Sequence, residues 1–549
     1  MPNLWIAMSH PRPSPAVAVL FLALAPAAAA LAQTAPDPGA LLEQQRQASQ
    51  PAPPALPAAP AAEAFAGFTS VSGLEPAEEA VLREVEARYR GQAVPARRVL
   101  ELAARELERR GVTVVLQADA RGAVRAVKPV LAAVEVTDER KRPRADLRAM
   151  LVRGLQLPGP LDRARLERNA TLLNETPGVR AAYRMQPGEQ PGQTRLGATL
   201  EDGGLLSGYV SLDTAGNRQI GRLQATGGLY VDNPLGLGER FSVNALASEH
   251  GRYLQGAADF LLHPSGLRGG FGYSSFRYDY SQGAVPFDGE ASAATLQASL
   301  PLARSEWART TVTLALDHKR NSGRANRRSL SEWEVDTLSL GLQGQHALPA
   351  AVSASYGLNL VQGDASQRNA AAALRDEPFL QQSGAFTKLA FQGRLVRALG
   401  QGGLSVALAG AGQVASKNLP GAEKFLIGGA GFMRGREPQL VGGDHAVHAE
   451  LRLDQEVGAS FRVGAFAEAA WLKANATRIT AAAYQANTAD LVRVADAGLR
   501  LSWAAGNGQA ELTVARPLDG TPRFMNGAPI EAHTGGSRWV AYARAVYRF

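Results

Sequence analysis

The chain has 549 residues, no cysteine and a formal net charge of +8. At about 150 residues per domain, this length predicts three or four units, or fewer if one of them is a large barrel. The basic residues are dispersed, which argues against a nucleic-acid-binding surface. The lack of cysteine excludes a thiolate metal site and a thiol nucleophile, and it allows an oxidising compartment without requiring one.

The N-terminus has the pattern of a secretory signal peptide. Arg12 precedes an apolar run over residues 16–30, and Ala30-Leu31-Ala32 has the small residues of a cleavage site. The run covers about 15 residues, fewer than the roughly 20 that a membrane-spanning helix needs, and Pro26 interrupts it. We therefore predict a signal peptide over residues 1–32 and a mature chain that starts near Gln33.

The next segment predicts a short helix and a linker. Residues 38–47 can form a helix with Pro38 in its first turn, so a helical segment is expected within 33–48. Residues 49–64 are rich in Pro and Ala, which is typical of an extended, semi-rigid tether. A helix this short is marginal alone in water, so it either docks on another surface or belongs to a disordered tail.

Residues 65–137 follow a β-α-α-β-β pattern. Two helices are predicted from apolar residues spaced four apart, which are Val81, Val85 and Tyr89 in the first and Val99, Ala103 and Leu107 in the second. Strands are predicted at Phe68–Val71, Val112–Leu116 and Val130–Val136, where β-branched residues gather. These elements predict one small α/β unit.

Residues 138–204 predict a second unit of the same kind, after a charged stretch at residues 138–144 that has the composition of a solvated connector. Its helices are indicated by Leu147, Met150 and Leu151 and by Leu166, Ala170 and Leu173. Its strands are expected at Val179–Met185 and Thr194–Leu200. Two tandem units fit this pattern better than one larger domain.

Residues 205–549 alternate between apolar and polar positions to the end of the chain. In residues 447–454, for example, Val447 and Leu451 share one face, whereas Glu450 shares the other with Arg452. A membrane barrel needs this alternation, because lipid satisfies no backbone hydrogen bonds and the sheet must close. A soluble sandwich alternates too, but the signal peptide and the length favour a barrel. At roughly 20 residues per strand and turn, we predict 16 antiparallel strands.

The last strand carries aromatic residues on one face. Trp539, Tyr547 and the terminal Phe549 lie at positions of the same parity. This ending resembles the insertion signal of bacterial outer-membrane barrels, and the alternative is an ordinary edge strand.

The order of these parts resembles the transporters of two-partner secretion, known as TpsB, the family of haemolysin and filamentous-haemagglutinin secretion proteins. In that family the two small units are POTRA domains. The resemblance covers nearly the whole mature chain. Four segments carry the local matches, namely 166–178 with 187–196, 208–239, 428–451 and 466–470.

The resemblance also implies a contact between a loop and the barrel wall. The family's sixth loop carries a hydrophobe-Arg-Gly-aromatic tetrad and folds inward, which places the loop here around residues 425–445. Arg434 and Gly435 match that motif, and the next strand offers Glu468 as the acid that Arg434 reaches. Arg436 stands where the family has an aromatic residue, and Glu468 and Ala470 stand where it has Asp and Gly.

By resemblance, the protein is expected in the outer membrane with its POTRA domains in the periplasm, where it exports a large exoprotein unfolded to the cell surface. The exoprotein's N-terminal secretion domain would bind the second POTRA domain at Val179, Arg180, Ala181, Tyr183 and Met185.

The helix at 33–48 would plug the pore. Outer-membrane lipids and the barrel assembly machinery are further expected partners. Two alternatives are a barrel assembly factor of the same superfamily and a passive porin. The porin hypothesis gives no role to residues 65–204.

No motif for catalysis or cofactor binding is found, so we expect neither an enzyme nor a cofactor. His445 and His448 are three apart, a spacing that suits metal ligands on a helix. They flank a predicted strand start and are expected to face different ways, so no metal site is predicted.

Overall fold

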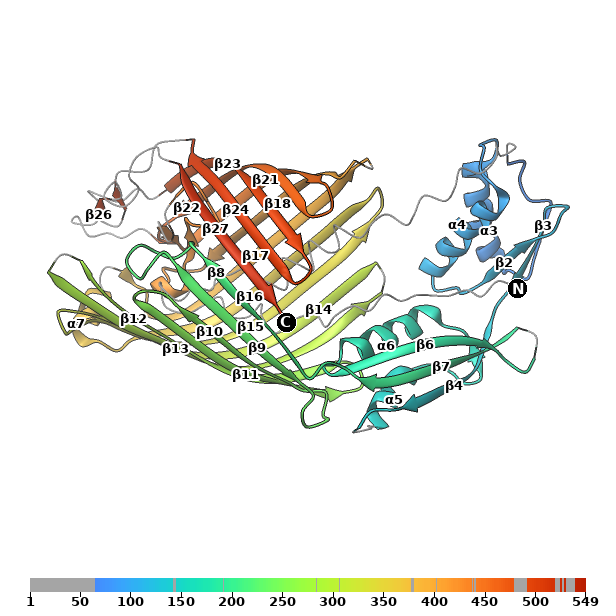
Figure 1. Cartoon of the computed structure of the whole chain (residues 1–549), viewed down its shortest axis with the longest axis horizontal. Coiled ribbons are helices and arrows are strands. Elements are labelled where there is room, and N and C mark those ends of the chain that lie inside the picture. Colours follow the sequence, from blue (N-terminus) through green and yellow to red (C-terminus); the bar gives the residue numbers. More distant parts are fainter. Residues whose placement is uncertain are drawn as a thin grey trace. The chain divides into compact units, whose positions relative to one another are not determined.

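The computed structural model describes residues 65–549 apart from 142–144, 191, 283, 306, 377–379, 401, 437, 439–440, 478–490, 519–523, 526–527 and 530–538. The expected signal peptide (1–32), plug helix (33–48) and Pro-rich linker (49–64) lie outside the described residues. The described chain divides near Gly203 into an α/β region and a barrel (Figure 1). Within the described residues, helices of the length and apolarity needed for a membrane crossing are absent.

The first α/β unit has the predicted order of elements. It contains β1 (Ser70–Ser72), α3 (Pro76–Tyr89), α4 (Ala96–Arg109), β2 (Val115–Ala118) and β3 (Ala123–Val127). The sheet has the order β1-β3-β2, with β1 parallel to β3. The predicted helix stripes are buried, since Val85 and Val99 pack with Leu82 in one core cluster.

The second α/β unit consists of β4 (Val130–Asp138), α5 (Ala145–Val152), β5 (Gly159–Pro160), α6 (Arg163–Glu175), β6 (Val179–Pro187) and β7 (Gln193–Asp202). Its sheet has the order β5-β4-β7-β6. Leu151, Leu173 and Leu200 are fully buried between the helices and this sheet.

The predicted boundary at 137/138 between the two units is wrong. The sequence pattern predicts residues 130–136 as a strand of the first unit, whereas β4 pairs in parallel with β7 of the second, with Val134 opposite Leu196. The first unit is instead completed by β3, a strand of five residues that the sequence analysis does not identify. Both strands have β-branched character, and composition alone does not indicate which sheet a strand joins. The second unit therefore begins at about residue 130.

The remaining residues form a closed antiparallel barrel, and the prediction of 16 strands is confirmed for the part of the chain that the structure describes. In chain order the strands are β8 (Leu206–Asp213), β9 (Gln224–Asp232), β10 (Arg240–Ala247), β11 (Gly251–His263), β12 (Leu267–Gln282), β13 (Val285–Arg304), β14 (Ala308–Ala325), β15 (Arg328–Leu348), β16 (Val352–Gln367), β17 (Gly384–Leu399), β18 (Leu404–Ala415), β21 (His445–Val457), β22 (Phe461–Lys473), β23 (Leu491–Ala505), β24 (Gly508–Pro517) and β27 (Val540–Arg548). Strand β27 pairs with β8 and closes the sheet.

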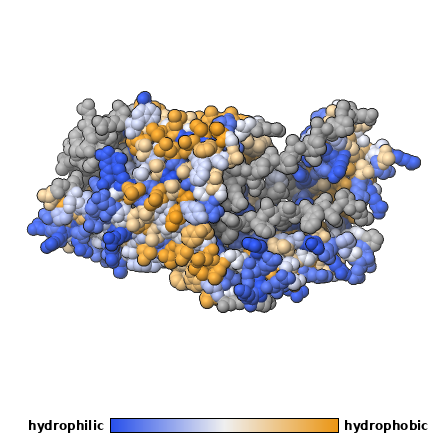
Figure 2. All heavy atoms as spheres, in the orientation of Figure 1, coloured by the Kyte–Doolittle hydropathy of each residue, from blue (hydrophilic) through white to orange (hydrophobic). Residues whose placement is uncertain are grey.

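The two faces of the barrel wall have opposite polarity. Along β22, Phe461, Val463 and Trp471 are exposed on the outer face, while Phe466 and Glu468 are buried on the inner face. Figure 2 shows apolar residues gathered over the outside of the barrel. The aromatic residues of the C-terminus, Trp539, Tyr547 and Phe549, are also exposed, as a lipid-facing girdle requires.

A long loop between β18 and β21 contains its own short elements. They are η3 (Gly421–Glu423), β19 (Phe425–Ile427) and β20 (Val441–Gly443), and the last two pair with each other. Other connections hold α7 (Ala370–Arg375), β25 (Phe524–Met525) and β26 (Ala528–Pro529). We call residues 416–444 the inner loop, because its side chains contact residues on the inner face of the wall.

Aromatic rings cover glycines on neighbouring barrel strands. In each case the two residues are direct cross-strand partners, and a Cβ added to the glycine would overlap the ring. The pairs are Tyr209–Gly228, Tyr278–Gly289, Tyr356–Gly344, Phe386–Gly363, Phe391–Gly412 and Phe466–Gly498. The missing side chain therefore leaves the space that the ring fills.

We predict that Gly289→Ala lowers the stability of the barrel by about 1–3 kcal/mol, because the new methyl group must displace the Tyr278 ring. Samples are heated in detergent to a series of temperatures, and gel electrophoresis then separates folded from unfolded barrel. The temperature at which half of the protein is unfolded measures this loss. Gly256→Ala is the matched control, since no atom lies within 4 Å of a Cβ at that position in β11. Equal unfolding temperatures for the two variants would contradict the prediction.

Candidate functional site

Arg434 lies at the tip of the inner loop and contacts two carboxylates on the wall. Its Nη1 lies 2.5 Å from Glu450 Oε2 on β21 and 3.5 Å from Glu468 Oε2 on β22. The backbone N–H of Arg434 also donates to Glu468 Oε1 over 2.5 Å. The Glu468 carboxylate therefore binds mainly the backbone of the loop, and Glu450 is the nearer partner of the Arg434 guanidinium.

The rest of the Arg434 side chain is enclosed by the loop and the wall. Its Nε donates to the carbonyl of Ala430 over 3.2 Å, and its guanidinium carbon lies 4.6 Å from the centre of the Phe466 ring. A cation over an aromatic face is attracted by the ring quadrupole. These contacts fix the orientation of the Arg434 side chain, while the carboxylates balance its charge.

Arg436 makes a second ion pair two residues further on. Its Nε donates to Asp496 Oδ1 on β23 over 2.9 Å, and the N–H of Gly435 donates to Asp496 Oδ2 over 2.8 Å. The hydroxyl of Tyr542 on β27 donates to the Arg436 carbonyl over 2.7 Å. Arg436 is only 2% exposed, although an aromatic residue is usual at this position in the family that the sequence resembles.

Gly435 allows the loop backbone to approach the wall closely. A Cβ at this position would lie 2.6 Å from the Arg516 carbonyl carbon and 2.7 Å from the Pro517 nitrogen, both at the end of β24. Because those are backbone atoms, they could not move aside without distorting the strand. A glycine between the two arginines is therefore required by space.

The three carboxylates form one row across adjacent strands. Glu450 is the direct partner of Glu468, and Glu468 is the direct partner of Asp496. We call these three residues the acid row. Like charges directly opposite each other on a sheet destabilise it, and each of these carboxylates is buried. The arginines of the inner loop supply the opposite charge that the row needs.

Further side chains extend the network around the acid row. His448 Nε2 lies 2.9 Å from Glu468 Oε2, and Arg452 Nη1 lies 3.4 Å from Glu450 Oε1. Arg452 also bonds Asp454 over 2.8 Å. His445, in contrast, accepts from the N–H of Ala415 over 3.4 Å, so the two histidines have different partners.

The structure brings together Arg434, Gly435 and Glu468, the three residues expected to join the loop to the barrel. Glu450 and Asp496 were not predicted as partners of the loop. The alternation in residues 447–454 places Glu450 on the polar face, but the register that sets it beside Glu468 is not visible in one sequence. Asp496 could have been found as an acid on the inner face of the next strand.

The five residues expected to bind a partner lie on β6, whose two edges differ. Within the described residues of the second α/β unit, β6 pairs with β7 alone. The N–H of Ala181 donates to the Asn174 side chain over 2.9 Å, so the odd-numbered N–H groups point away from β7. Val179 and Ala181 are buried, whereas Arg180 and Met185 are exposed.

Tyr183 ties β6 to α6. Its hydroxyl donates to the Ala170 carbonyl over 3.1 Å, and burial raises the pKa of this hydroxyl. The ring therefore fills the space between strand and helix. Among the outward N–H groups of β6, those of Val179 and Ala181 bond Thr176 and Asn174 within the unit.

Comparison with known proteins identifies relatives of this chain. The family model for the haemolysin secretion/activation proteins ShlB, FhaC and HecB matches residues 192–468, just over half of the chain. The heme/hemopexin transporter protein HuxB of Haemophilus influenzae is 24% identical over 295 residues, which are 52% of each chain. The outer membrane transporter CdiB of Dickeya dadantii is 26% identical over 117 residues, which cover 21% of this chain and 20% of the relative. The matched region thus spans about half the length of the HuxB relatives.

Solved structures show the same fold. CdiB from Escherichia coli has a TM-score of 0.64 at 19% identity, covering 95% of this chain and 98% of that chain. CdiB from Acinetobacter baumannii has a TM-score of 0.62 at 16% identity, covering 95% of this chain and 99% of that chain. The barrel and the preceding α/β region therefore belong to a shared architecture.

We predict that Arg436→Ala loosens the loop tip, because it leaves Asp496 buried without its guanidinium partner. Loss of one member of a buried pair costs roughly 3–5 kcal/mol. The rate at which a protease cuts the inner loop in the folded barrel measures the effect. Arg277→Ala is the control, because its pair with Glu290 is exposed and contributes only about 0–1 kcal/mol. Similar cutting rates in both variants would refute the role of Arg436.

Proposed function

This chain belongs to the haemolysin secretion/activation protein family, and we propose that it moves a large exoprotein across the outer membrane by two-partner secretion. The observation that carries the proposal is the contact between the inner loop and the acid row. A loop held inside a barrel by ion pairs is suited to a pore that closes and opens. A passive porin would not need it, nor the two α/β units.

The ion pairs at the tip supply a reversible closure. Arg434 has two acceptors on adjacent strands within 3.5 Å of one nitrogen, so its bonds can shift between them. An extended polypeptide that enters the lumen brings its own backbone and side-chain polar groups, which replace part of what the tip loses. Transport then needs no covalent chemistry, and we propose that the protein is not an enzyme.

The two α/β units would act as POTRA domains that capture the exoprotein in the periplasm. An exposed strand edge binds an extended chain by strand addition, in which backbone hydrogen bonds provide affinity. The N–H groups of Tyr183 and Met185 share the outward direction of the Ala181 N–H, and they support the second unit, and the surface that includes Arg180 and Met185, as the site for the exoprotein's N-terminal secretion domain. The partners we propose beyond the exoprotein are outer-membrane lipids around the apolar belt and the barrel assembly machinery.

We predict that Arg434→Ala reduces secretion of the exoprotein about tenfold or more, because the tip loses the ion pairs that return it to one position on the wall after each passage, and breaking a buried pair costs roughly 3–5 kcal/mol. Secretion is measured as tagged exoprotein in the culture medium. Arg277→Ala serves as the control, and the amounts of other outer-membrane barrels show whether assembly is affected instead. Normal secretion by Arg434→Ala would reject the proposal, and depletion of other barrels would favour an assembly factor.

We predict that Met185→Pro impairs capture of the exoprotein, because proline removes an outward N–H from the free edge of β6. Met185→Ala keeps that N–H and removes only the exposed side chain. Binding of the tagged secretion domain to the full-length transporter should fall about tenfold for the proline variant and little for the alanine variant. Equal binding by both variants would exclude strand addition at this edge.

A further inference from the structure

The inner loop has a second charged contact with the barrel, close to its first residues. The carboxylate of Glu423 lies between two lysines, with Lys319 Nζ 2.9 Å from Oε1 and Lys388 Nζ 2.8 Å from Oε2. All three side chains are at least nine-tenths buried. Lys388 and Gln413 also donate to the Glu423 carbonyl, each over 3.0 Å. Both the side chain and the backbone of Glu423 are therefore held.

This contact has the opposite polarity to the contact at the tip. Near residue 423 the loop carries the acid and the wall carries the cations, while at residues 434–436 the loop carries the cations and the wall carries the acid row. A loop placed the other way round would set like charges against each other at both ends. The charge pattern thus specifies one orientation of the loop.

The two contacts lie on different parts of the wall. Lys319, Lys388 and Gln413 belong to β14, β17 and β18, whereas the tip contacts β21, β22, β23 and β27. In the order of the closed sheet, β14 and β23 are separated by β15, β16, β17, β18, β21 and β22. Because β18 pairs directly with β21, the loop follows the inner face of the wall from the β14–β18 stretch at Glu423 to the β21–β27 stretch at its tip.

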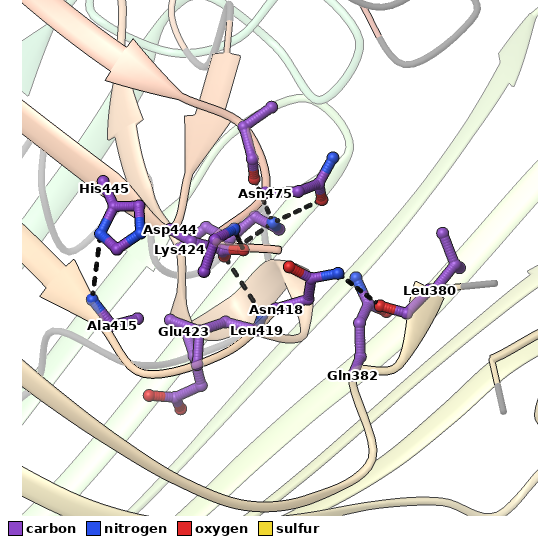
Figure 3. Close-up of polar contacts among 12 residues, drawn as sticks. Leu380, Gln382, Ala415, Asn418, Leu419, Glu423, Lys424, Asp444, His445 and Asn475 are labelled. Carbon is purple, nitrogen blue, oxygen red and sulfur yellow. Dashed lines mark hydrogen bonds and ion pairs between the residues drawn. The ribbon is translucent and has the colours of Figure 1, made fainter. Parts of the chain in front are cut away.

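Polar contacts also fix the two ends of the loop to neighbouring connections. Lys424 bonds Asp444 over 2.7 Å and the Ala474 carbonyl over 2.6 Å, and Asn418 donates to the Leu380 carbonyl over 2.8 Å. Figure 3 shows Lys424 and Asp444 facing each other, while Glu423 points away from them. We call Glu423, Lys424 and their partners the base of the loop.

A pair of glycines separates the base from the tip. Gly428 and Gly429 follow β19 directly, with φ of 103° and 100°. The N–H of Gly428 bonds the Phe432 carbonyl and the N–H of Gly429 bonds the Arg436 carbonyl, so the chain turns back at this point. Left-handed backbone is readily adopted by glycine, and the two residues can rotate with less steric hindrance than others.

We propose that Glu423 is a positioning residue that holds the base on the β14–β18 wall, so that the tip alone leaves the acid row by rotation about Gly428 and Gly429. The inner loop is then a hinged gate with one fixed end. Opening frees the part of the lumen beside β21–β23 and leaves the base in place. Because the base stays fixed, the arginines of the tip return to the same three carboxylates when the gate closes.

The natural absence of cysteine makes the base and the tip separately measurable. Ala422→Cys reports on the base and Met433→Cys on the tip, because both side chains are buried, at 4% and 0% exposure. Each reporter is placed in the full-length protein together with Arg434→Ala, with Glu423→Gln or with neither. The rate of reaction with a water-soluble maleimide is then measured on the inserted barrel, without exoprotein.

Arg434→Ala should raise labelling of the tip reporter at least about tenfold, which corresponds to 1.4 kcal/mol of local opening, and leave the base reporter protected. Glu423→Gln should raise labelling of the base reporter. Equal labelling of both reporters in Arg434→Ala would overturn the hinge, and unchanged protection of the base in Glu423→Gln would overturn the anchor.

Two controls keep the result interpretable. Folding of each variant is checked by its migration in unheated gels, and Glu423→Asp keeps the charge if the glutamine variant fails to fold. The aspartate is one methylene shorter and no longer reaches both lysines equally, so it should give an intermediate labelling rate at the base. A labelling rate equal to the parent would count against the anchor. Because no exoprotein is present, the outcome does not depend on the secretion assays above.

Discussion

Three carboxylates side by side on the inner wall impose the main constraint on this barrel. Glu450, Glu468 and Asp496 are buried in one row, and their mutual repulsion must be offset by cations. The wall supplies Arg452 beside the row, and the inner loop supplies Arg434 and Arg436 directly. The position of the loop tip therefore follows from the charge of the wall, because the tip carries the cations that the acid row needs.

Ion pairs can hold the loop tip on the acid row and still allow it to leave. A buried pair adds little net stability relative to apolar packing, because desolvation offsets most of the attraction. It does specify geometry, since a guanidinium and a carboxylate must meet in a defined orientation. Apolar residues also contribute here, with Met433 packed against Ala470 and Val494. The balance gives a loop that has one closed position and remains able to leave it when water or polypeptide enters.

The sequence predicts those features that depend on periodicity and local motif. The length of the alternating region predicts the 16 strands, and alternation predicts the two faces of β22. The family resemblance implies the meeting of Arg434 with Glu468, and alternation places Glu468 on the side where they can meet. Features that depend on pairing could not be anticipated. The assignment of β4 to the wrong unit, the partner Asp496 and the lysines around Glu423 are all set by which strands lie side by side and in which register.

The glycine–aromatic pairs have a consequence for how the barrel is assembled. Each ring lies over a residue without a side chain, so a slip of one residue would bring most of these rings against a Cβ and turn them to the other face. The pairs occur at six strand interfaces from β8–β9 to β22–β23. The seam between β27 and β8, by contrast, is a short ladder from Arg544 to Arg548. Errors in strand register are thus disfavoured sterically as neighbouring strands pair. When β27 meets β8, the register of the strands between them is already set, so the short seam does not have to set it.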